Sequence, residues 1–444
     1  MTAIRNKKPK VTVRTYRHGL GDCHLVTLYG TRGSTFRILI DCGVILGTKS
    51  AAEKMTKVME DILQVSDGKV DLLVVTHEHW DHVSGFLQAK ESFAKLQAEE
   101  IWMGWTENPD DKDAKILRVT READLLKLQA AAMQMHINDP KGESILTSML
   151  EFFGAVGTGM STKKAMQAVR SKETKKLRYC DPADPPTTLS NFKAQIYVLG
   201  PPRQMNFLKK ISSSKSPTQT ETYSMAALAF DATVGPLFGD ASQDGNKPFT
   251  SPYRIPLAVS KSNAFFQKNY WESDPWRRID GAWMNDADAF ALALDNLTNN
   301  TSLVLAIDIE NIGVLLFAAD AQVGNWLSWS GCKWTVNDKE ITGVDLLKRT
   351  VFYKVGHHGS WNATLRDEGL SLMEALNYAV IPVDHDMALK KNWGKIPLGT
   401  LQSAIEAATK DRGFVLRTDE EPSEQAKSRG AKSSDLFFDV DLFN

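Results

Sequence analysis

Three histidines and one aspartate stand within six residues of one another, in the segment HEHWDH at residues 77–82. The chain has only nine histidines in 444 residues, so chance composition explains this density poorly. His77 and His79 directly follow an apolar stretch, and in an extended backbone side chains two apart project to the same side. They are therefore candidates for holding one metal ion. Imidazole and carboxylate ligands favour zinc, with manganese or iron as alternatives.

Asp81 and His82 follow within one turn of chain. They offer a hard carboxylate oxygen and a further imidazole nitrogen, which can face a neighbouring ion where the chain enters a helix. Because so many metal-binding groups follow one buried-type strand, we interpret the segment as a metal site.

The pattern of strands and helices predicted around this segment is typical of a layered α/β protein. Short apolar runs end abruptly in polar residues or glycine, as buried strands do. We predict strands over residues 36–40, 71–75, 314–317, 351–355, 378–383 and 413–417. Residues 51–64 carry apolar side chains at helical spacing, and residues 401–410 repeat this pattern more weakly. Candidate ligands thus follow strand ends in a fold whose helices cover sheet faces.

Two long stretches interrupt this alternation. Residues 104–190 are predicted to be mostly helical, with a helix over 112–138, and residues 203–290 begin polar and finish rich in tryptophan. We interpret both as insertions, with lids or partner surfaces as roles. The core then comprises residues 1–103, a strand within 191–202 and residues 291–444. The charged residues 419–434 predict a mobile loop before a final strand at 437–443.

Composition excludes several classes of protein. With 53 Lys and Arg against 54 Asp and Glu, the net charge of −1 gives no general attraction to nucleic acid or anionic membranes. The four cysteines are scattered, which favours reduced thiols over a disulfide framework. The sequence contains no apolar run of about 18 residues and no signal-peptide pattern. We therefore expect a soluble cytoplasmic protein that makes no membrane contact.

The HEHWDH segment resembles the H-x-H-x-D-H signature of the metallo-β-lactamase superfamily, and Asp41-Cys42-Gly43 resembles its D-x-G element. Four other segments resemble the ComEC-like branch, namely HGLGDCH at 18–24, ADA at 319–321, KVGHHGS at 354–360 and RTD at 417–419. That branch includes the nuclease-like domain of bacterial DNA-uptake proteins and many stand-alone hydrolases. The resemblance covers residues 11–85, 193–202 and 296–420, and it implies an αββα sandwich with two large, mostly helical or irregular insertions.

The resemblance also implies two divalent metal ions, zinc ahead of manganese. Their implied ligands are His77, His79, Asp81, His82, Asp320 and either His357 or His358. His77 and His79 would hold one ion, and Asp320 would bridge both, although an aspartate at a strand end also often caps a helix. The sequence leaves the choice between His357 and His358 open, and the spare imidazole would contact a substrate phosphate or act as an acid. Asp81, Asp320 and His358 are the predicted catalytic residues.

Other residues are expected around these ligands. Asp41 and Asp22 are predicted to accept imidazole N–H groups or to fix the loop. The segment NNTS, with Asn299 and Ser302, stands where many superfamily members supply a third histidine to the first ion. ComEC-like members share this polar feature, so we expect the first site to be the weaker one. His385 follows a strand end and is a further candidate for the cleft.

Two adjacent ions activate a water for attack, so hydrolysis is the expected reaction class. The branch favours phosphodiesters, with nucleic acid or a nucleotide as the binding partner. A basic run over residues 163–178 is able to contact phosphates, but a solvated helix face explains it better. One alternative is a metallo-hydrolase of a carbonyl ester, thioester or amide. Another is a regulatory or binding subunit with a structural metal, whose insertions contact a protein partner.

Overall fold

The computed structural model describes residues 9–138, 145–154, 161–210, 255, 257–273, 282–391, 393, 396–409 and 412–443. The chain divides into two compact units. The first comprises residues 1–121, 151–215 and 295–444, and the second comprises residues 122–150 and 216–294. All the predicted site residues belong to the first unit. Residues 211–254 and 274–281, which make up most of the predicted second insertion, lie outside the described part of the chain.

Eight strands form the first sheet, in the order β16-β17-β1-β2-β3-β4-β5-β6. Their bounds are β1 Val11–Tyr16, β2 His24–Tyr29, β3 Thr35–Ile40, β4 Lys69–Val74, β5 Gln97–Gly104, β6 Lys176–Cys180, β16 Lys432–Ser433 and β17 Phe437–Leu442. Neighbouring strands from β3 to β6 run parallel, so their carboxyl ends lie at one edge of the sheet.

Seven strands form the second sheet, in the order β15-β14-β13-β10-β9-β8-β7. Their bounds are β7 Thr187–Leu189, β8 Ala194–Gly200, β9 Val304–Ile309, β10 Gly313–Phe317, β13 Thr350–Lys354, β14 Tyr378–Ile381 and β15 Phe414–Arg417. The strands β10, β13, β14 and β15 are parallel. A separate hairpin pairs β11 (Lys333–Val336) with β12 (Lys339–Thr342).

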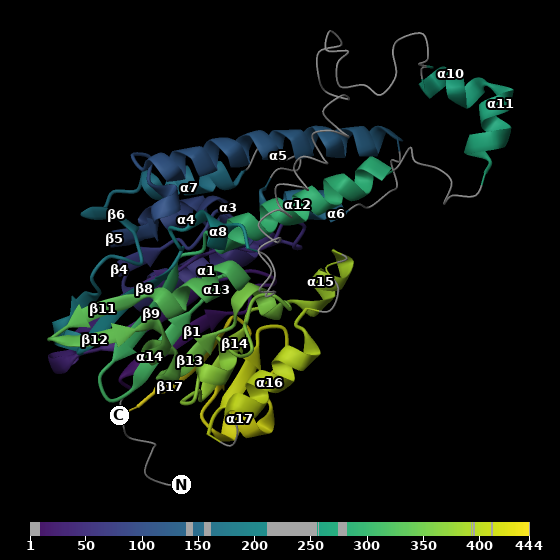
Figure 1. Cartoon of the computed structure of the whole chain (residues 1–444). Coiled ribbons are helices and arrows are strands. Elements are labelled where there is room, and N and C mark those ends of the chain that lie inside the picture. The colour runs from purple at the N-terminus through teal and green to yellow at the C-terminus, as the bar shows by residue number, and fades with distance from the viewer. Residues whose placement is uncertain are drawn as a thin grey trace. The chain divides into compact units, whose positions relative to one another are not determined.

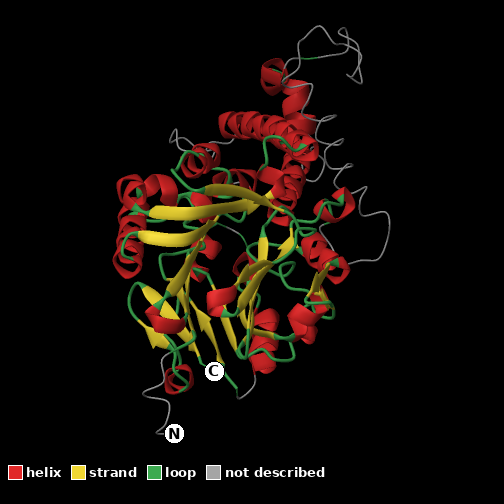
Figure 2. Cartoon of the chain, turned by 90° about the vertical axis from the view of Figure 1, so that its left-hand side faces the viewer, coloured by secondary structure: helices red, strands yellow, loops and turns green. Residues whose placement is uncertain are grey.

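The two sheets pack face to face, and their strands form the inner layers of the first unit (Figure 2). Buried side chains from both sheets meet there, among them Val13, Ile38, Ile307 and Phe352. The helices α1 (Ala51–Ser66), α3 (Gly85–Gln88), α4 (Lys90–Lys95) and α7 (Thr162–Arg170) pack on the outer face of the first sheet. The helices α13 (Val323–Ser328), α14 (Gly343–Lys348) and α16 (Gly399–Thr409) contact the second sheet (Figure 1). This arrangement confirms the predicted αββα sandwich.

The predicted helices follow from the spacing of their apolar residues. Met55, Val58, Met59 and Ile62 of α1 recur at helical spacing and are all fully buried. The predicted helix over 112–138 coincides with α5 (Lys112–Asn138). The remaining helices include α2 (Trp80–Val83), α6 (Ile145–Phe152), α8 (Met205–Leu208), α10 (Leu257–Ser262), α11 (Ala264–Phe266), α12 (Ala282–Asn300), α15 (His385–Lys390) and α17 (Glu424–Ser428). Among the described helices, none is both long and apolar enough to cross a membrane.

Two segments contain more regular structure than their sequences indicate. Residues 104–190 include β6 and β7, which extend the two core sheets beyond the helices expected there. The prediction of a plain loop over residues 419–434 was wrong. Ser423 caps α17 by accepting a hydrogen bond from the Ala426 N–H, and β16 pairs with β17. A local cap and a strand partner distant in sequence thus order a stretch poor in apolar residues.

Gly43 marks the place where the loop after β3 touches the start of α2. The Cys42 N–H donates to the His82 carbonyl at 2.9 Å. A Cβ at Gly43 would lie 2.5 Å from backbone atoms of Asp81 and His82, which is closer than real contacts allow. The glycine of the D-x-G segment therefore permits the backbone approach that positions Asp81 and His82.

We expect Gly43→Ala to lower the free energy of unfolding by about 1–3 kcal/mol, because the methyl group would push against backbone that is itself packed. Gly331→Ala is the control, since no atom lies within 4 Å of its Cβ position. Its effect should stay within about 0.5 kcal/mol. Denaturant unfolding of both variants measures the difference, and equal effects would contradict the importance of this close approach.

Candidate metal centre

The predicted ligands gather where parallel strands of both sheets end. Asp41 directly follows β3, and residues 77–82 follow β4 and enter α2. Asp320 follows β10, and His358 follows β13, the parallel neighbour of β10. Because parallel strands end at a common sheet edge, and the two sheets face each other, segments far apart in sequence meet at one place.

Four of these residues form a compact buried group. Asp81, His82, Asp320 and His358 each direct one ligand atom to a common place, and these atoms all lie within 4.8 Å of one another. His82 Nε2 is 3.1 Å from Asp320 Oδ2, and His358 Nε2 is 2.9 Å from Asp81 Oδ2. All four side chains are at most 1% exposed.

The donor set of this group fits a divalent cation. Asp81 Oδ1, His82 Nε2 and Asp320 Oδ2 are buried and have no hydrogen-bond partner among the described residues. Buried polar atoms without partners cost free energy, and coordination of a cation satisfies such atoms. Two carboxylates and two imidazoles supply the four ligands that zinc takes in proteins.

His77 and His79 form an adjacent pair. His77 Nε2 lies 3.1 Å from His79 Nδ1, and both side chains are buried. Two nitrogens bound to one tetrahedral zinc ion are about 3.3 Å apart, given bonds of about 2.0–2.1 Å. The pair therefore has the spacing to share one cation.

Asp41 contacts Nδ1 of His82, whereas Nε2 of the same ring belongs to the four-residue group. Its Oδ1 accepts the Thr76 N–H at 2.8 Å, and its Oδ2 accepts the Thr76 hydroxyl at 2.6 Å. The same Oδ2 lies 2.8 Å from His82 Nδ1. An N–H donated from Nδ1 leaves the lone pair of Nε2 directed at Asp320.

The rings of His358 and His77 are held in the same manner. His358 Nδ1 is 2.7 Å from the Pro382 carbonyl, so it carries the proton and leaves Nε2 as the ligand atom. His77 Nδ1 lies 3.4 Å from the Ser302 hydroxyl. That hydroxyl also accepts the Asp320 N–H at 3.3 Å, which ties the two predicted metal positions together.

Lys354 is a buried cation at the centre that sequence reasoning did not single out. Its ammonium pairs with Asp22, donates to the Ala319 carbonyl at 2.9 Å and lies 3.4 Å from Asp320 Oδ1. Burial would raise the pKa of Asp22, but Lys354 and His82 hold it well below its ordinary value. The available signal was the place of Lys354 at the end of a strand, as the first residue of the KVGHHGS segment.

The imidazoles differ in charge. Burial alone would lower the pKa of His82, yet the carboxylates of Asp320, Asp22 and Asp81 raise it well above its ordinary value. Burial lowers the pKa of His79 to about 3, and it lowers that of His77 well below the ordinary value. His77 and His79 are therefore neutral, which is the form of histidine that binds metal. His82 would have to release a proton in order to bind a metal ion.

The structure separates the two histidines of the HHGS segment. His357 lies outside the four-residue group and is more exposed than His358. Its N–H donates to Asp320 Oδ1 at 3.1 Å, and its ring Nδ1 is 2.9 Å from the Ser360 hydroxyl. His357 thus steadies Asp320 through its backbone and leaves its ring beside the centre.

Two other predicted residues contact different partners. His385 Nδ1 lies 2.7 Å from the Ile396 carbonyl, and the hydrogen bonds given by the structure do not join His385 to the clustered ligands. Asn299 donates to Asp295 Oδ2 at 3.1 Å. Asp295 was not a predicted site residue, although its Oδ1 lies 3.7 Å from His79 Nε2.

Aromatic side chains flank His79. The rings of Phe152 and Phe153 have centroids 5.3 Å and 5.1 Å from that of His79. Phe152 also stacks on Trp393, with centroids 4.5 Å apart and an interplanar angle of 19°. These contacts join segments distant in sequence, so no local pattern indicated them.

Comparison with known families agrees with the geometry. Residues 18–100 match the family model of the metallo-beta-lactamase superfamily, a range that includes Asp22, Asp41 and the HEHWDH segment. No curated protein matches the chain. The family match, the sandwich and the buried ligand group together indicate a metal-dependent hydrolase. The ComEC-like branch stays a prediction.

We expect Lys354→Met to destabilise the metal-free protein by about 3–5 kcal/mol near neutral pH, because buried carboxylates lose their counter-charge. In the unchanged protein the pKa of Asp22 is lower in the folded state than in the unfolded state, where it is about 3.9. Asp22 therefore contributes to stability above about pH 3.9, and this contribution is lost as the pH falls through the folded pKa. The variant lacks this contribution, so its deficit should shrink as the pH falls below about 4. Urea unfolding with a chelator present measures this, with the exposed Lys339→Met as control. A deficit that does not change with pH would contradict the assigned role.

We expect His358→Ala to remove the ion held by Asp81, His82 and Asp320, and His357→Ala to retain it. The reason is that only His358 directs a ring nitrogen into the four-residue group. Metal content measured by mass spectrometry after dialysis distinguishes the two variants. Loss of the same ion from both would refute the assignment.

Proposed function

We propose that this chain is a metal-dependent hydrolase whose substrates are phosphodiesters. The observation that carries the proposal is the buried group of Asp81, His82, Asp320 and His358 beside the neutral His77 and His79 pair. When bound, two divalent ions lower the pKa of a shared water and stabilise negative charge on the attacked group. The residue types and spacing at this centre suit that chemistry.

The chain's own residues would prepare the centre in distinct ways. Asp320 is the proposed bridging ligand, because its Oδ2 faces His82 while Lys354 and the His357 N–H fix its Oδ1. Asp41 and the Pro382 carbonyl keep the tautomers of His82 and His358 suitable for ligation. Fixed ligands reduce the reorganisation that charge development would otherwise require.

The ring of His357 is the proposed spare imidazole. It lies beside the ligand group and is partly exposed, so a bound substrate can reach it. Burial lowers its pKa, which favours a neutral ring that donates a hydrogen bond to a phosphate oxygen. Protonation of the leaving group is the second role open to it.

The phosphodiester assignment rests on the ComEC-like segments and on the suitability of two ions for in-line displacement at phosphorus. The basic run does not add to this support. Arg170 pairs with Glu107, Arg178 with Asp184, and Lys175 with Glu99. These pairs favour the structural interpretation of the run.

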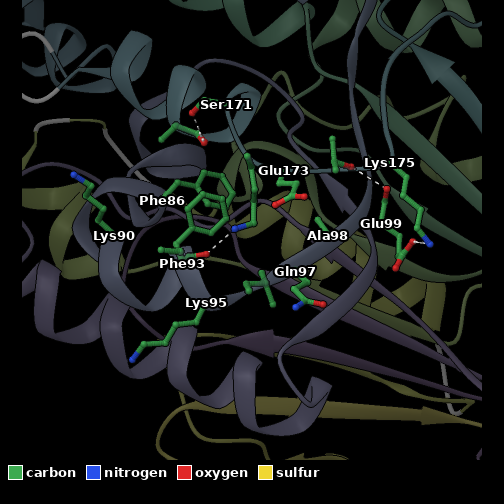
Figure 3. A pocket seen from close by; sticks show the side chains of 15 residues that line it. Phe86, Lys90, Phe93, Lys95, Gln97, Ala98, Glu99, Ser171, Glu173 and Lys175 are labelled. Carbon is green, nitrogen blue, oxygen red and sulfur yellow. Dashed lines mark hydrogen bonds and ion pairs between the residues drawn. The ribbon is translucent and has the colours of Figure 1, made fainter.

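Part of the basic run lines a cavity of about 740 Å³ between α4, β5 and the turn after α7 (Figure 3). Lys172 donates to the Phe93 carbonyl at 2.8 Å, and Glu99 lies at the start of β5. Because β5 pairs with β4 with Leu72 opposite Glu100, Glu99 is level with Asp71. His77 lies beyond the end of β4, and none of the candidate metal ligands lines the cavity. This cavity is therefore separate from the metal centre.

One observation favours a second substrate class. Phe152, Phe153 and Trp393 form an aromatic cluster against His79. Phe152 and Phe153 are buried and Trp393 is partly exposed, so the Trp393 edge of the cluster is the apolar surface that suits the acyl part of a carbonyl ester or thioester. The two classes differ in the bond that is broken, and a substrate panel separates them.

We expect purified protein loaded with zinc or manganese to hydrolyse a bis-aryl phosphodiester or nucleic acid, and not nitrocefin or an aryl thioester. His77→Ala and Asp320→Ala should lower kcat/KM by at least about 100-fold, since each removes a proposed ligand. His385→Ala is the matched control and should keep its activity. Thioester turnover alone would favour the second class, and inactivity of metal-loaded protein on every substrate would overturn the hydrolase proposal.

A further inference from the structure

Three of the four buried imidazoles at the centre are held in the same way. His77, His82 and His358 each direct one nitrogen inward, and a fixed group of the protein holds the other nitrogen. His79 directs Nδ1 towards His77, so its Nε2 is the nitrogen that needs a partner. By general coordination chemistry, an unsupported ligating imidazole is poorly oriented and less basic.

Asp295 of α12 occupies the place of that partner. Its Oδ1 lies 3.7 Å from His79 Nε2, and both atoms are buried without a hydrogen-bond partner among the described residues. The gap exceeds a hydrogen bond by about 0.5–0.8 Å, and rotation about the soft Cβ–Cγ bond moves Oδ1 by that much. The two atoms thus lie near each other. Within the described part of the chain, Nε2–H of His79 is a donor without an acceptor, and Oδ1 of Asp295 is an acceptor without a donor.

The surroundings of Asp295 support this pairing. Asn299, one helical turn further along α12, donates to Oδ2 at 3.1 Å and leaves Oδ1 for His79. Asp295 is buried, and burial together with the nearby carboxylates of Asp81 and Asp320 raises its pKa. Phe152 and Phe153 flank the imidazole, and an apolar environment strengthens a hydrogen bond.

We propose that Asp295 accepts a hydrogen bond from His79 Nε2–H and thereby keeps the lone pair of Nδ1 directed at the first metal ion. Asp295 is a positioning residue, and this role rests on the proposed metal centre. Its effect falls on the first site, where the segment NNTS at residues 299–302 stands in place of the third histidine of many superfamily members. Oδ1 accepts the hydrogen bond whether the carboxyl group is ionised or protonated.

Zinc titration of the metal-free protein against a chromophoric chelator tests the proposal. We expect two ions per chain in the unchanged protein. Asp295→Ala should weaken the first ion by about 10–100-fold and leave the second unchanged. Asp295→Asn keeps an acceptor oxygen and should recover most of the affinity. Asp308→Asn is the matched control, because Asp308 pairs with Arg349 and contacts none of the ligands.

A second measurement is made on the protein with Asp295 unchanged. In zinc-loaded protein labelled with ¹⁵N-histidine, NMR should show the tautomer of His79 protonated at Nε2, with His79→Gln used to assign the signal. Protonation at Nδ1 would overturn the proposal. So would Asp295→Ala binding both ions normally, or losing both equally. If the unchanged protein binds no divalent ion, the proposed function fails as well, so the two failures are distinguishable.

Discussion

Buried charge at the junction of the two sheets is the constraint on which the centre depends. Asp22, Asp81 and Asp320 are almost completely buried within one small region. Carboxylates in such a place repel one another and lose hydration, so nearby positive charge must offset both effects. Lys354 supplies one fixed cation, and the raised pKa of His82 supplies another in metal-free protein. A divalent ion bound here would replace the His82 proton and stabilise the same carboxylates, so stability and metal binding would be linked.

Both sheets contribute loops to this centre, because parallel strands of each sheet end there. The loops after β3 and β4 come from one sheet, and those after β10 and β13 come from the other. The apolar side chains between the sheets hold these two sets of loops together. The absence of a side chain at Gly43 then lets α2 approach the loop after β3, which brings Asp81 and His82 into line with Asp320.

The two predicted metal positions are supported unequally. His82 and His358 are held by an aspartate and a backbone carbonyl at 2.8 Å and 2.7 Å, which are short and firm contacts. His77 Nδ1 lies 3.1 Å from the Thr76 hydroxyl and 3.4 Å from the Ser302 hydroxyl, whereas the partner proposed for His79 is at 3.7 Å. Weaker positioning of His79, together with the lack of a third histidine, explains why the pair His77 and His79 should hold the more exchangeable ion.

The sequence by itself determined the strands β3, β4, β10 and β13 that lead to the centre, the main helices and the ligand candidates, because hydrophobic periodicity and short motifs are local properties of the chain. It did not reveal that β6 extends the first sheet, since sheet pairing joins residues distant in sequence. Nor did it choose between His357 and His358. That choice depends on backbone in which both residues have positive φ, of 41° and 54°, and on the carbonyl of Pro382. Asp295 and Phe152 entered the centre only through tertiary contacts, because a buried partner leaves no periodic signal.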